Sequence, residues 1–321
     1  MKSQPNGKMS AVPGLPARNL ECVGQSTATS SRRGNPSLGS FLLPDGFARP
    51  GTLEVLREGS VVLEAGRLAL ASLDDRRRRR ATSYAARGVP RSEEPVILVP
   101  GFMAGDTTLL AMSRTLRRRG FRTYRSHIHA NVGCTLTAAA ELETRIESIA
   151  IKRGSRVRIV GHSLGGLLAR GLAVRRPDLI SGVVTLGSPM LAPGAHHVVL
   201  TAGVDALVRL SRAGVPGLMS EECVAGNCAR QSFDECREPL PDDVSFTAIY
   251  SRRDGIVDWR ACVDPEAHAV EVTASHVGMV VDPRVMGIVT DALHLPAYAA
   301  RPGQQRIPGG SVLEVDSGES A

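Results

Sequence analysis

The stretch IVGHSLGGLLARGLA, residues 159–173, places Ser163 between glycines where an apolar run meets a helix-like run. The preceding VRIV is typical of a buried strand, and the run from Leu164 onward predicts a helix. A sharp strand-to-helix turn strains the serine backbone and projects its hydroxyl above the sheet. Gly161 and Gly165 suit the points where such a strand and helix pass closely. The pattern predicts a nucleophile elbow, and the alternative is an ordinary turn in which Ser163 is only a small residue.

Strands and helices alternate regularly from residue 95 onward. The expected strands cover residues 95–101, 121–128, 157–160, 182–189, 245–251 and 269–274. The expected helices cover residues 107–120, 135–154, 164–176, 196–212 and 283–295. Alternating elements of this length predict an α/β fold, with a mostly parallel central sheet flanked by helices on both faces.

Composition divides the chain into four parts. Residues 1–50 are rich in Ser, Gly, Pro and Asn and are predicted to be a disordered extension. Residues 51–94 are predicted to form an amphipathic helix and a basic linker. The main domain is expected at 95–295, with a cap insertion at 190–243 that is longer than a plain connection. Residues 296–321 are expected to form a flexible tail.

The helix predicted before the main domain carries leucines at three- and seven-residue steps, at Leu53, Leu56, Leu63 and Leu70. This spacing is typical of an amphipathic helix, and we expect its apolar stripe to pack on the main domain. The alternative is a weak peripheral contact with a membrane through residues 52–80, which include five consecutive arginines.

A serine hydroxyl needs a base to take its proton, and the base needs a carboxylate to orient it. His276, on the loop after the last predicted strand, is the favoured base. Asp254 follows the strand before it and is the favoured acid, because Gly255 permits a tight turn there. Asp258 is the rival acid; the alternative for either aspartate is a turn or a helix cap. Ser163, Asp254 and His276 follow one another in the chain order expected of a fold with a nucleophile elbow.

An oxyanion hole should supply backbone N–H groups to the developing negative charge. We expect one from Leu164, directly after the nucleophile. The other should come from the loop after strand 95–101, where Phe102 is favoured and Met103 is next. Met103 and His129 are also expected to line the substrate pocket.

Five motifs together resemble an α/β-hydrolase, nearest to small bacterial lipases and esterases: PVILVPGF, VRIVGHSLGG, VVTLGSP, FTAIYSRRDGIVDW and SHVGM. The run SRRDGIVDWRACVDP with SHVGM is similar to actinobacterial members of that superfamily. The resemblance spans about residues 52–295 and implies Ser163 as nucleophile, Asp254 as acid, His276 as base, and Phe102 with Leu164 as oxyanion donors. It departs from many lipases in having Pro-Gly-Phe rather than His-Gly in the oxyanion loop.

These residues predict a serine hydrolase that cleaves carboxylic esters through an acyl-enzyme on Ser163. An acyltransferase or a thioesterase would use the same residues, and a non-catalytic binding protein of this fold is the alternative from a different class. Within the cap, Val198, Val199, Leu200, Leu207 and Leu210 predict either an apolar lid over acyl chains or simply the buried face of a helix.

Composition and charge indicate which kinds of partner, cofactor and location to expect. The net charge of +7 comes from scattered arginine clusters that are typical of solvated faces, so no nucleic acid is expected. Cys223, Cys228 and Cys236 follow no common zinc spacing, and we expect no metal and no cofactor; the alternative is a metal site or a structural disulfide at these cysteines. Neither a signal peptide nor a membrane-spanning run is evident, which predicts a cytoplasmic location and cysteines present as thiols. The expected partner is a small-molecule or lipid ester, and the oligomeric state is left open.

Overall fold

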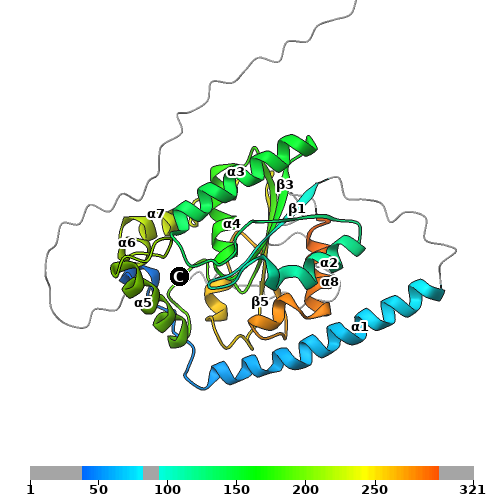
Figure 1. The fold of residues 1–321 in the computed structure, drawn as a ribbon, viewed down its shortest axis with the longest axis horizontal. Coiled ribbons are helices and arrows are strands. Elements are labelled where there is room, and N and C mark those ends of the chain that lie inside the picture. Colours follow the sequence, from blue (N-terminus) through cyan, green and yellow to red (C-terminus); the bar gives the residue numbers. More distant parts are fainter. Residues whose placement is uncertain (1–37, 82–93, 296–321) are drawn as a thin grey trace, which may run out of the picture.

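A computed structural model describes residues 38–81 and 94–295 of the chain, without the side chains of 74–81. Within these residues six strands form one parallel sheet in the order β2-β1-β3-β4-β5-β6. The strands are β1 (Pro95–Val99), β2 (Arg122–Arg125), β3 (Val157–His162), β4 (Ile180–Leu186), β5 (Ser245–Tyr250) and β6 (His268–Glu271). Figure 1 shows the sheet between two layers of helices, which confirms the predicted fold class.

The two faces of the sheet carry separate apolar cores, because successive strand residues point to opposite sides. One face packs against α2 (Leu110–Arg118), α8 (Pro283–Ala292) and the short helices η3 (Asp106–Leu109) and η5 (Val277–Val280). The other face packs against α3 (Thr135–Arg153) and α4 (Leu164–Arg175). In β1, Val96 and Leu98 join the first core while Ile97 and Val99 join the second.

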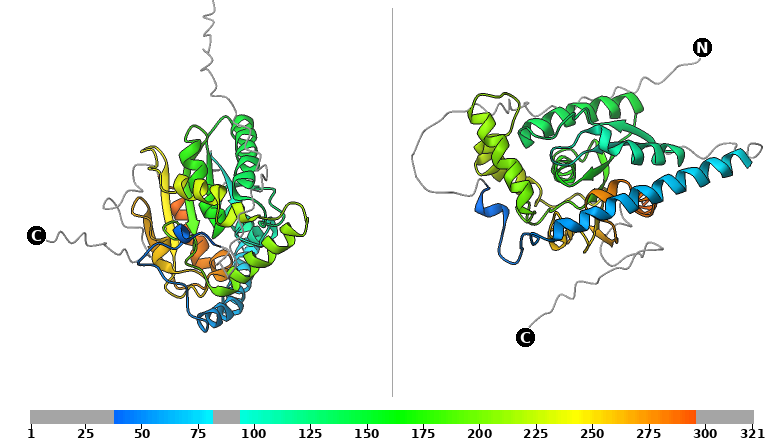
Figure 2. Two further views of the ribbon diagram at one scale, coloured as in Figure 1. Left: turned by 90° about the vertical axis from the view of Figure 1, so that its left-hand side faces the viewer. Right: turned by 60° about the horizontal axis from the view of Figure 1, so that its bottom comes forward.

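The cap lies at one end of the molecule (Figures 1 and 2) and consists of α5 (Val198–Arg212), α6 (Glu221–Val224) and α7 (Asn227–Glu235). Its base joins the loop after β5, where the His197 N–H donates to the Ile256 carbonyl at 2.7 Å. In the same place the Asp258 N–H donates to the Ala195 carbonyl at 2.9 Å. The cap is therefore hydrogen-bonded to the loop that carries the predicted acid.

Residues 38–50 differ from the predicted disorder. They contain the short helix η1 (Ser40–Leu42), and Leu42 is buried against Phe233 of α7. The Gly39 N–H donates to the Val224 carbonyl of α6 at 2.9 Å. A short apolar run, FLL, attaches this segment to the cap, and the average composition of residues 1–50 conceals it. Residues 1–37 and the predicted tail at 296–321 lie outside the described residues.

The segment before the main domain is helical, with η2 (Glu54–Ser60) followed by α1 (Val61–Ala81), which runs beside α8 (Figure 1). Its burial is the reverse of the prediction. The side chains of Leu53, Leu56, Leu63 and Leu70 are exposed by 65–75%, whereas the side chain of Glu64 is 1% exposed. The segment packs through the partly buried Val55 and Leu68 and through the Glu58 and Glu64 carboxylates, which bind backbone amides. The leucine spacing therefore indicated the helix but not the face that it buries.

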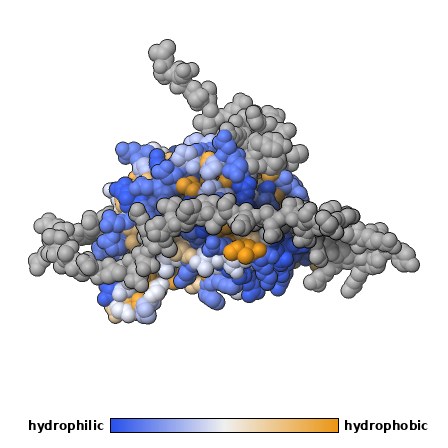
Figure 3. All heavy atoms as spheres, turned by 90° about the horizontal axis from the view of Figure 1, so that it is seen from above, coloured by the Kyte–Doolittle hydropathy of each residue, from blue (hydrophilic) through white to orange (hydrophobic). Residues whose placement is uncertain are grey.

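The outer surface is mainly hydrophilic on the face in Figure 3, where hydrophobic side chains are scattered. Within the described residues, no helix combines the length and apolar character needed to cross a membrane.

Candidate active site

Ser163 occupies a sharp turn between β3 and α4, with backbone angles φ 51° and ψ −121°. A positive φ is costly for any residue other than glycine and marks stored backbone strain. The turn is possible because its flanks lack side chains. A Cβ on Gly161 would lie 2.5 Å from the Gly165 carbonyl oxygen, and a Cβ on Gly165 would lie 2.3 Å from the Val99 carbonyl oxygen. Both glycines thus have the close-packing role that the sequence indicated.

His276 and Asp254 are directly joined. The His276 Nδ1–H donates to Asp254 Oδ2 at 2.6 Å, and both side chains are buried. The other carboxylate oxygen of Asp254 accepts the N–H groups of Ile256 and Val257, each at 2.8 Å. These bonds hold the carboxylate toward the imidazole, so that the Nε2 of His276 is left as the basic nitrogen.

Asp258 has a different set of partners. Its carboxylate caps the short helix η4 (Trp259–Cys262) by accepting the Arg260 N–H at 3.1 Å. It also accepts the Arg260 guanidinium at 3.0 Å and the Ala48 N–H at 3.1 Å. This geometry favours Asp254 over Asp258 as the carboxylate paired with His276.

The end of β4 brings these loops to the elbow. The Ser163 N–H donates to the Leu186 carbonyl at 2.9 Å, and Gly187 follows with φ 56°. A Cβ on Gly187 would lie 3.0 Å from His276 Nδ1 and 3.2 Å from Asp254 Oδ2. Ser163, Asp254 and His276 therefore gather at the carboxyl edge of the sheet, where ligands bind in open α/β folds.

The electrostatics of His276 suit a base that must also hold a proton. Burial lowers the pKa of the imidazole, but the charge and hydrogen bond of Asp254, with the charge of Glu58, outweigh burial and raise the pKa above its usual value. The neighbouring His162 ring lies 4.8 Å away, centroid to centroid. Burial and the positive charge of His276 lower the His162 pKa to about 3, so this ring stays neutral. Its Nε2–H donates to the His276 carbonyl at 3.1 Å and supports that loop.

Two carboxylates that sequence reasoning missed hold the loops of the site in place. Glu58 of η2 accepts three backbone N–H groups, from Gly255 and His276 at 3.0 Å and from Val277 at 2.9 Å. It therefore ties the loop of Asp254 to the loop of His276. Glu64 of α1 accepts both the N–H and the hydroxyl of Ser275 at 2.8 Å.

Gly255 has a second consequence for this arrangement. A Cβ at this position would lie 2.3 Å from the Glu54 carbonyl oxygen, so the missing side chain lets η2 approach the loop of Asp254. The sequence suggested only that Gly255 permits a tight turn. A buried glutamate in a helical segment resembles a solvated one in sequence, and no residue pattern pointed to Glu58 or Glu64.

The loop after β1 lies against Ser163. A Cβ on Gly101 would lie 3.0 Å from the Ser163 Cβ. In this loop the Met103 N–H donates to the Asn131 carbonyl at 3.0 Å and the Ala104 N–H to the Gly101 carbonyl at 3.1 Å. No acceptor for the Phe102 N–H lies among the residues that the structure describes. Leu164 is the first residue of α4, where a helix leaves its N–H groups without intrahelical partners.

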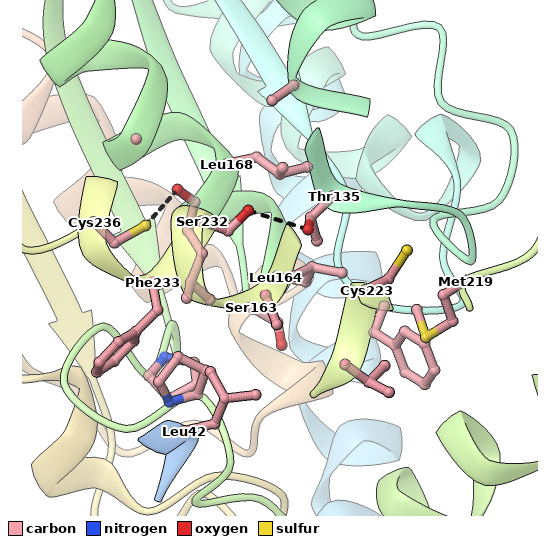
Figure 4. A pocket seen from close by; sticks show the side chains of 18 of the residues that line it. Leu42, Thr135, Ser163, Leu164, Leu168, Met219, Cys223, Ser232, Phe233 and Cys236 are labelled. Carbon is pink, nitrogen blue, oxygen red and sulfur yellow. Dashed lines mark hydrogen bonds between the residues drawn. The ribbon is translucent and has the colours of Figure 1, made fainter. Parts of the chain in front are cut away.

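A pocket opens over Ser163 between α4 and the cap (Figure 4). Its wall is mostly apolar and includes Leu42, Phe102, Leu164, Leu168, Leu200, Val204, Met219, Val224 and Phe233. Leu200 and Val204 come from the cap helix that the sequence indicated, although Val198, Val199 and Leu210 of the predicted stripe are exposed. The cap thus contributes an apolar wall above the serine.

The two predicted substrate contacts do not line this pocket. The Met103 side chain is 60% exposed, and a Cβ on Gly203 of α5 would lie 3.4 Å from its sulfur. The His129 side chain is exposed. Its backbone carbonyl packs against Gly105, where an added Cβ would lie 2.0 Å from the His129 carbonyl oxygen. Their positions put both side chains outside the apolar wall over Ser163.

The comparisons with known proteins agree with this architecture. Residues 76–207 match the family model described as the alpha/beta hydrolase fold. A lipase from Bacillus licheniformis, BlEst2 in its propeptide form, superimposes with a TM-score of 0.53 at 13% identity, covering 68% of this chain and 53% of that one. The chain has the α/β-hydrolase fold.

Sequence similarity to known lipases is distant. A triacylglycerol lipase of Vibrio cholerae is 27% identical over 153 residues, which cover 46% of this chain and 45% of the lipase. Lipase B of Aspergillus fumigatus is 17% identical, with a TM-score of 0.46, and the match covers 70% of this chain and 57% of the lipase. The chain thus spans about half the length of the lipases that it matches.

Proposed function

We propose that the protein is a serine hydrolase that cleaves carboxylic esters. The observation that carries the proposal is the strained Ser163 at a strand-to-helix turn, at the same edge of the sheet as an imidazole that is hydrogen-bonded at 2.6 Å to a buried carboxylate. Distant similarity to a triacylglycerol lipase supports an ester as the substrate class.

In the proposed reaction the Ser163 hydroxyl attacks the acyl carbon while His276 Nε2 accepts the hydroxyl proton. The N–H groups of Leu164 and Phe102 stabilise the negative charge on the acyl oxygen. Protonated His276 then gives its proton to the departing alcohol, which leaves an acyl group on Ser163. Water, activated by the same imidazole, attacks the acyl-enzyme and releases the acid.

The apolar pocket favours an acyl group over a charged or sugar-like one. Its cap wall has room for hydrocarbon beside Ser163, and burial of each CH₂ contributes about 0.8 kcal/mol to binding. We therefore infer that the acyl chain lies between α4 and α5. An acyltransferase or a thioesterase would use the same residues. Weak peripheral contact with a membrane through the exposed leucines of residues 52–80 also stays a prediction.

The test is hydrolysis of p-nitrophenyl esters from acetate to palmitate by the full chain. We expect kcat/KM to rise with acyl length and the Ser163→Ala variant to lose on the order of 10⁴-fold or more in kcat. Release of nitrophenol at an equal rate by wild type and Ser163→Ala would refute the proposal.

A further inference from the structure

Three thiols that are distant in sequence meet where the cap joins the core. Cys134 is the residue that precedes α3, Cys223 lies in α6, and Cys228 lies in α7. Their sulfur atoms all lie within 4.8 Å of one another. Each thiol comes from a different element, so the cluster exists only when the cap is seated on the core.

The surroundings of the cluster are held by polar contacts across the same seam. The Ser232 hydroxyl of α7 donates to the hydroxyl of Thr135, the first residue of α3, at 3.1 Å (Figure 4). The Met219 N–H donates to the Val132 carbonyl at 2.8 Å. Cys228 is buried, whereas Cys134 and Cys223 are half-buried and keep access to solvent. The packing of the cap on the core therefore holds the three cysteines together, and an ion can reach them at the half-buried Cys134 and Cys223.

We propose that Cys134, Cys223 and Cys228 bind one soft, thiophilic cation, with Zn²⁺ as the reference ion. Zinc–thiolate bonds of about 2.3 Å place the three sulfurs roughly 3.8 Å apart in a tetrahedral site. The observed cluster reaches that spacing by contraction of about 1 Å or less, within the reach of side-chain rotation at the half-buried cysteines. Three thiolates leave a fourth position for water.

The protons balance as the ion binds. Three S–H bonds break, three Zn–S bonds form, and three protons pass to solvent, because only the thiolate is a ligand. Protons then compete with the ion, and affinity should increase as the pH rises.

A bound ion would connect α6 and α7 to the start of α3. Cys223 also lines the pocket over Ser163, so the ion would fix one wall of that pocket. The spacing of cysteines 223, 228 and 236 gave no sign of this site, because its third ligand is Cys134 rather than Cys236.

The experiment uses the reduced, metal-free full chain, titrated with Zn²⁺ against a chromophoric chelator and with Co²⁺ as a spectroscopic probe. We expect one Zn²⁺ per chain and a thiolate-to-cobalt charge-transfer band. Cys134→Ser and Cys223→Ser should each weaken Zn²⁺ binding at least 10-fold, whereas Cys22→Ser and Cys236→Ser should not change it. If Cu⁺ binds with the same cysteine dependence and Zn²⁺ does not, the site stands and its ion is Cu⁺.

Absence of any cation uptake by the reduced wild type would overturn the proposal, as would binding that survives replacement of all three cysteines. A Cys223–Cys228 disulfide that persists in the full chain under excess thiol reductant would also overturn it. Because Cys228 is buried, thermal melts of the metal-free variants accompany the titrations, and the half-buried Cys134 carries the test if Cys228→Ser does not fold. The readout is metal binding, so it is independent of ester hydrolysis.

Discussion

The cap and the η2–α1 segment both adjoin the carboxyl edge of the sheet, but the side chains that they bring to the candidate site differ in chemistry. The cap presents apolar side chains, such as Leu200 and Val204, to the pocket over Ser163. The η2–α1 segment leaves Leu56 and Leu63 exposed and places the Glu58 and Glu64 carboxylates on backbone amides.

This difference suits the two regions to different roles. Apolar contact is non-directional and suits a wall that accommodates a hydrocarbon chain. Carboxylate-to-amide hydrogen bonds are directional and suit the fixing of loop geometry. We therefore expect changes in η2–α1 to alter kcat and stability, and changes in the cap to alter the preference for acyl length.

The largest expected effect is at the acid that Glu58 helps to hold in place. Asp254→Asn should lower kcat on the order of 10⁴-fold, because an amide does not hold the required His276 tautomer or stabilise its charged form. Asp258→Asn is the matched control and should keep kcat within a few-fold while it lowers stability. Steady-state kinetics with circular dichroism measures both, and a larger loss of kcat at Asp258 would reverse the assignment.

The second effect concerns stability. A Cβ on Gly278 would lie 1.6 Å from Glu64 Oε2, so Gly278→Ala should displace the buried carboxylate and cost about 2–3 kcal/mol of unfolding free energy. Gly66→Ala, in the same helix as Glu64, meets open space and should be neutral or stabilising by about 0.5–1 kcal/mol. Urea unfolding compares the two, and equal changes would show that α1 does not dock through Glu64.

The third effect is a shift in pH dependence. The charge and hydrogen bond of Asp254, with the negative charge of Glu58, raise the His276 pKa. Activity needs the deprotonated imidazole, so kcat/KM should decrease on acidification. The midpoint of this decrease should lie at a higher pH than for an ordinary histidine. Glu58→Gln removes that charge, so this acid limb should move to lower pH. Loss of loop positioning should also reduce kcat about 10-fold, the effect of about 1.4 kcal/mol on the barrier.

Glu54→Gln is the control for this shift, because Glu54 lies in the same short helix and its carboxylate binds Gly51 and Arg57 among the described residues. Its pH–rate profile should match that of the wild type. An unchanged acid limb and an unchanged kcat in Glu58→Gln would mean that the carboxylate is merely structural.

The smallest effect tests the cap. Leu200→Ala removes hydrocarbon from the pocket wall and should raise KM for long-chain esters several-fold, with little change for acetate. Leu210→Ala, on the exposed side of the same helix, should change neither. If Leu200→Ala affects acetate and palmitate esters equally, the acyl chain does not lie against α5.

Much of the fold was predictable, because strand and helix periods from residue 95 onward are regular and glycines mark the elbow. The pairing of Asp254 with His276 was likewise accessible, since each follows a strand that ends at the same edge of the sheet. Burial in η2–α1 was not predictable, because leucine spacing describes a helix without naming what the helix faces. Glu58 and Glu64 bind backbone amides, which carry no residue signature, and Cys134 joins the cap cysteines only through the tertiary fold.

The central claim is that Ser163 is an activated nucleophile, and covalent labelling tests it most directly. A fluorophosphonate should add one phosphonyl group to the wild-type chain, located by peptide mass spectrometry at Ser163. Labelling should be absent in Ser163→Ala and much slower in His276→Ala, with both variants folded. An unlabelled wild type, or equal labelling of wild type and Ser163→Ala, would contradict the account.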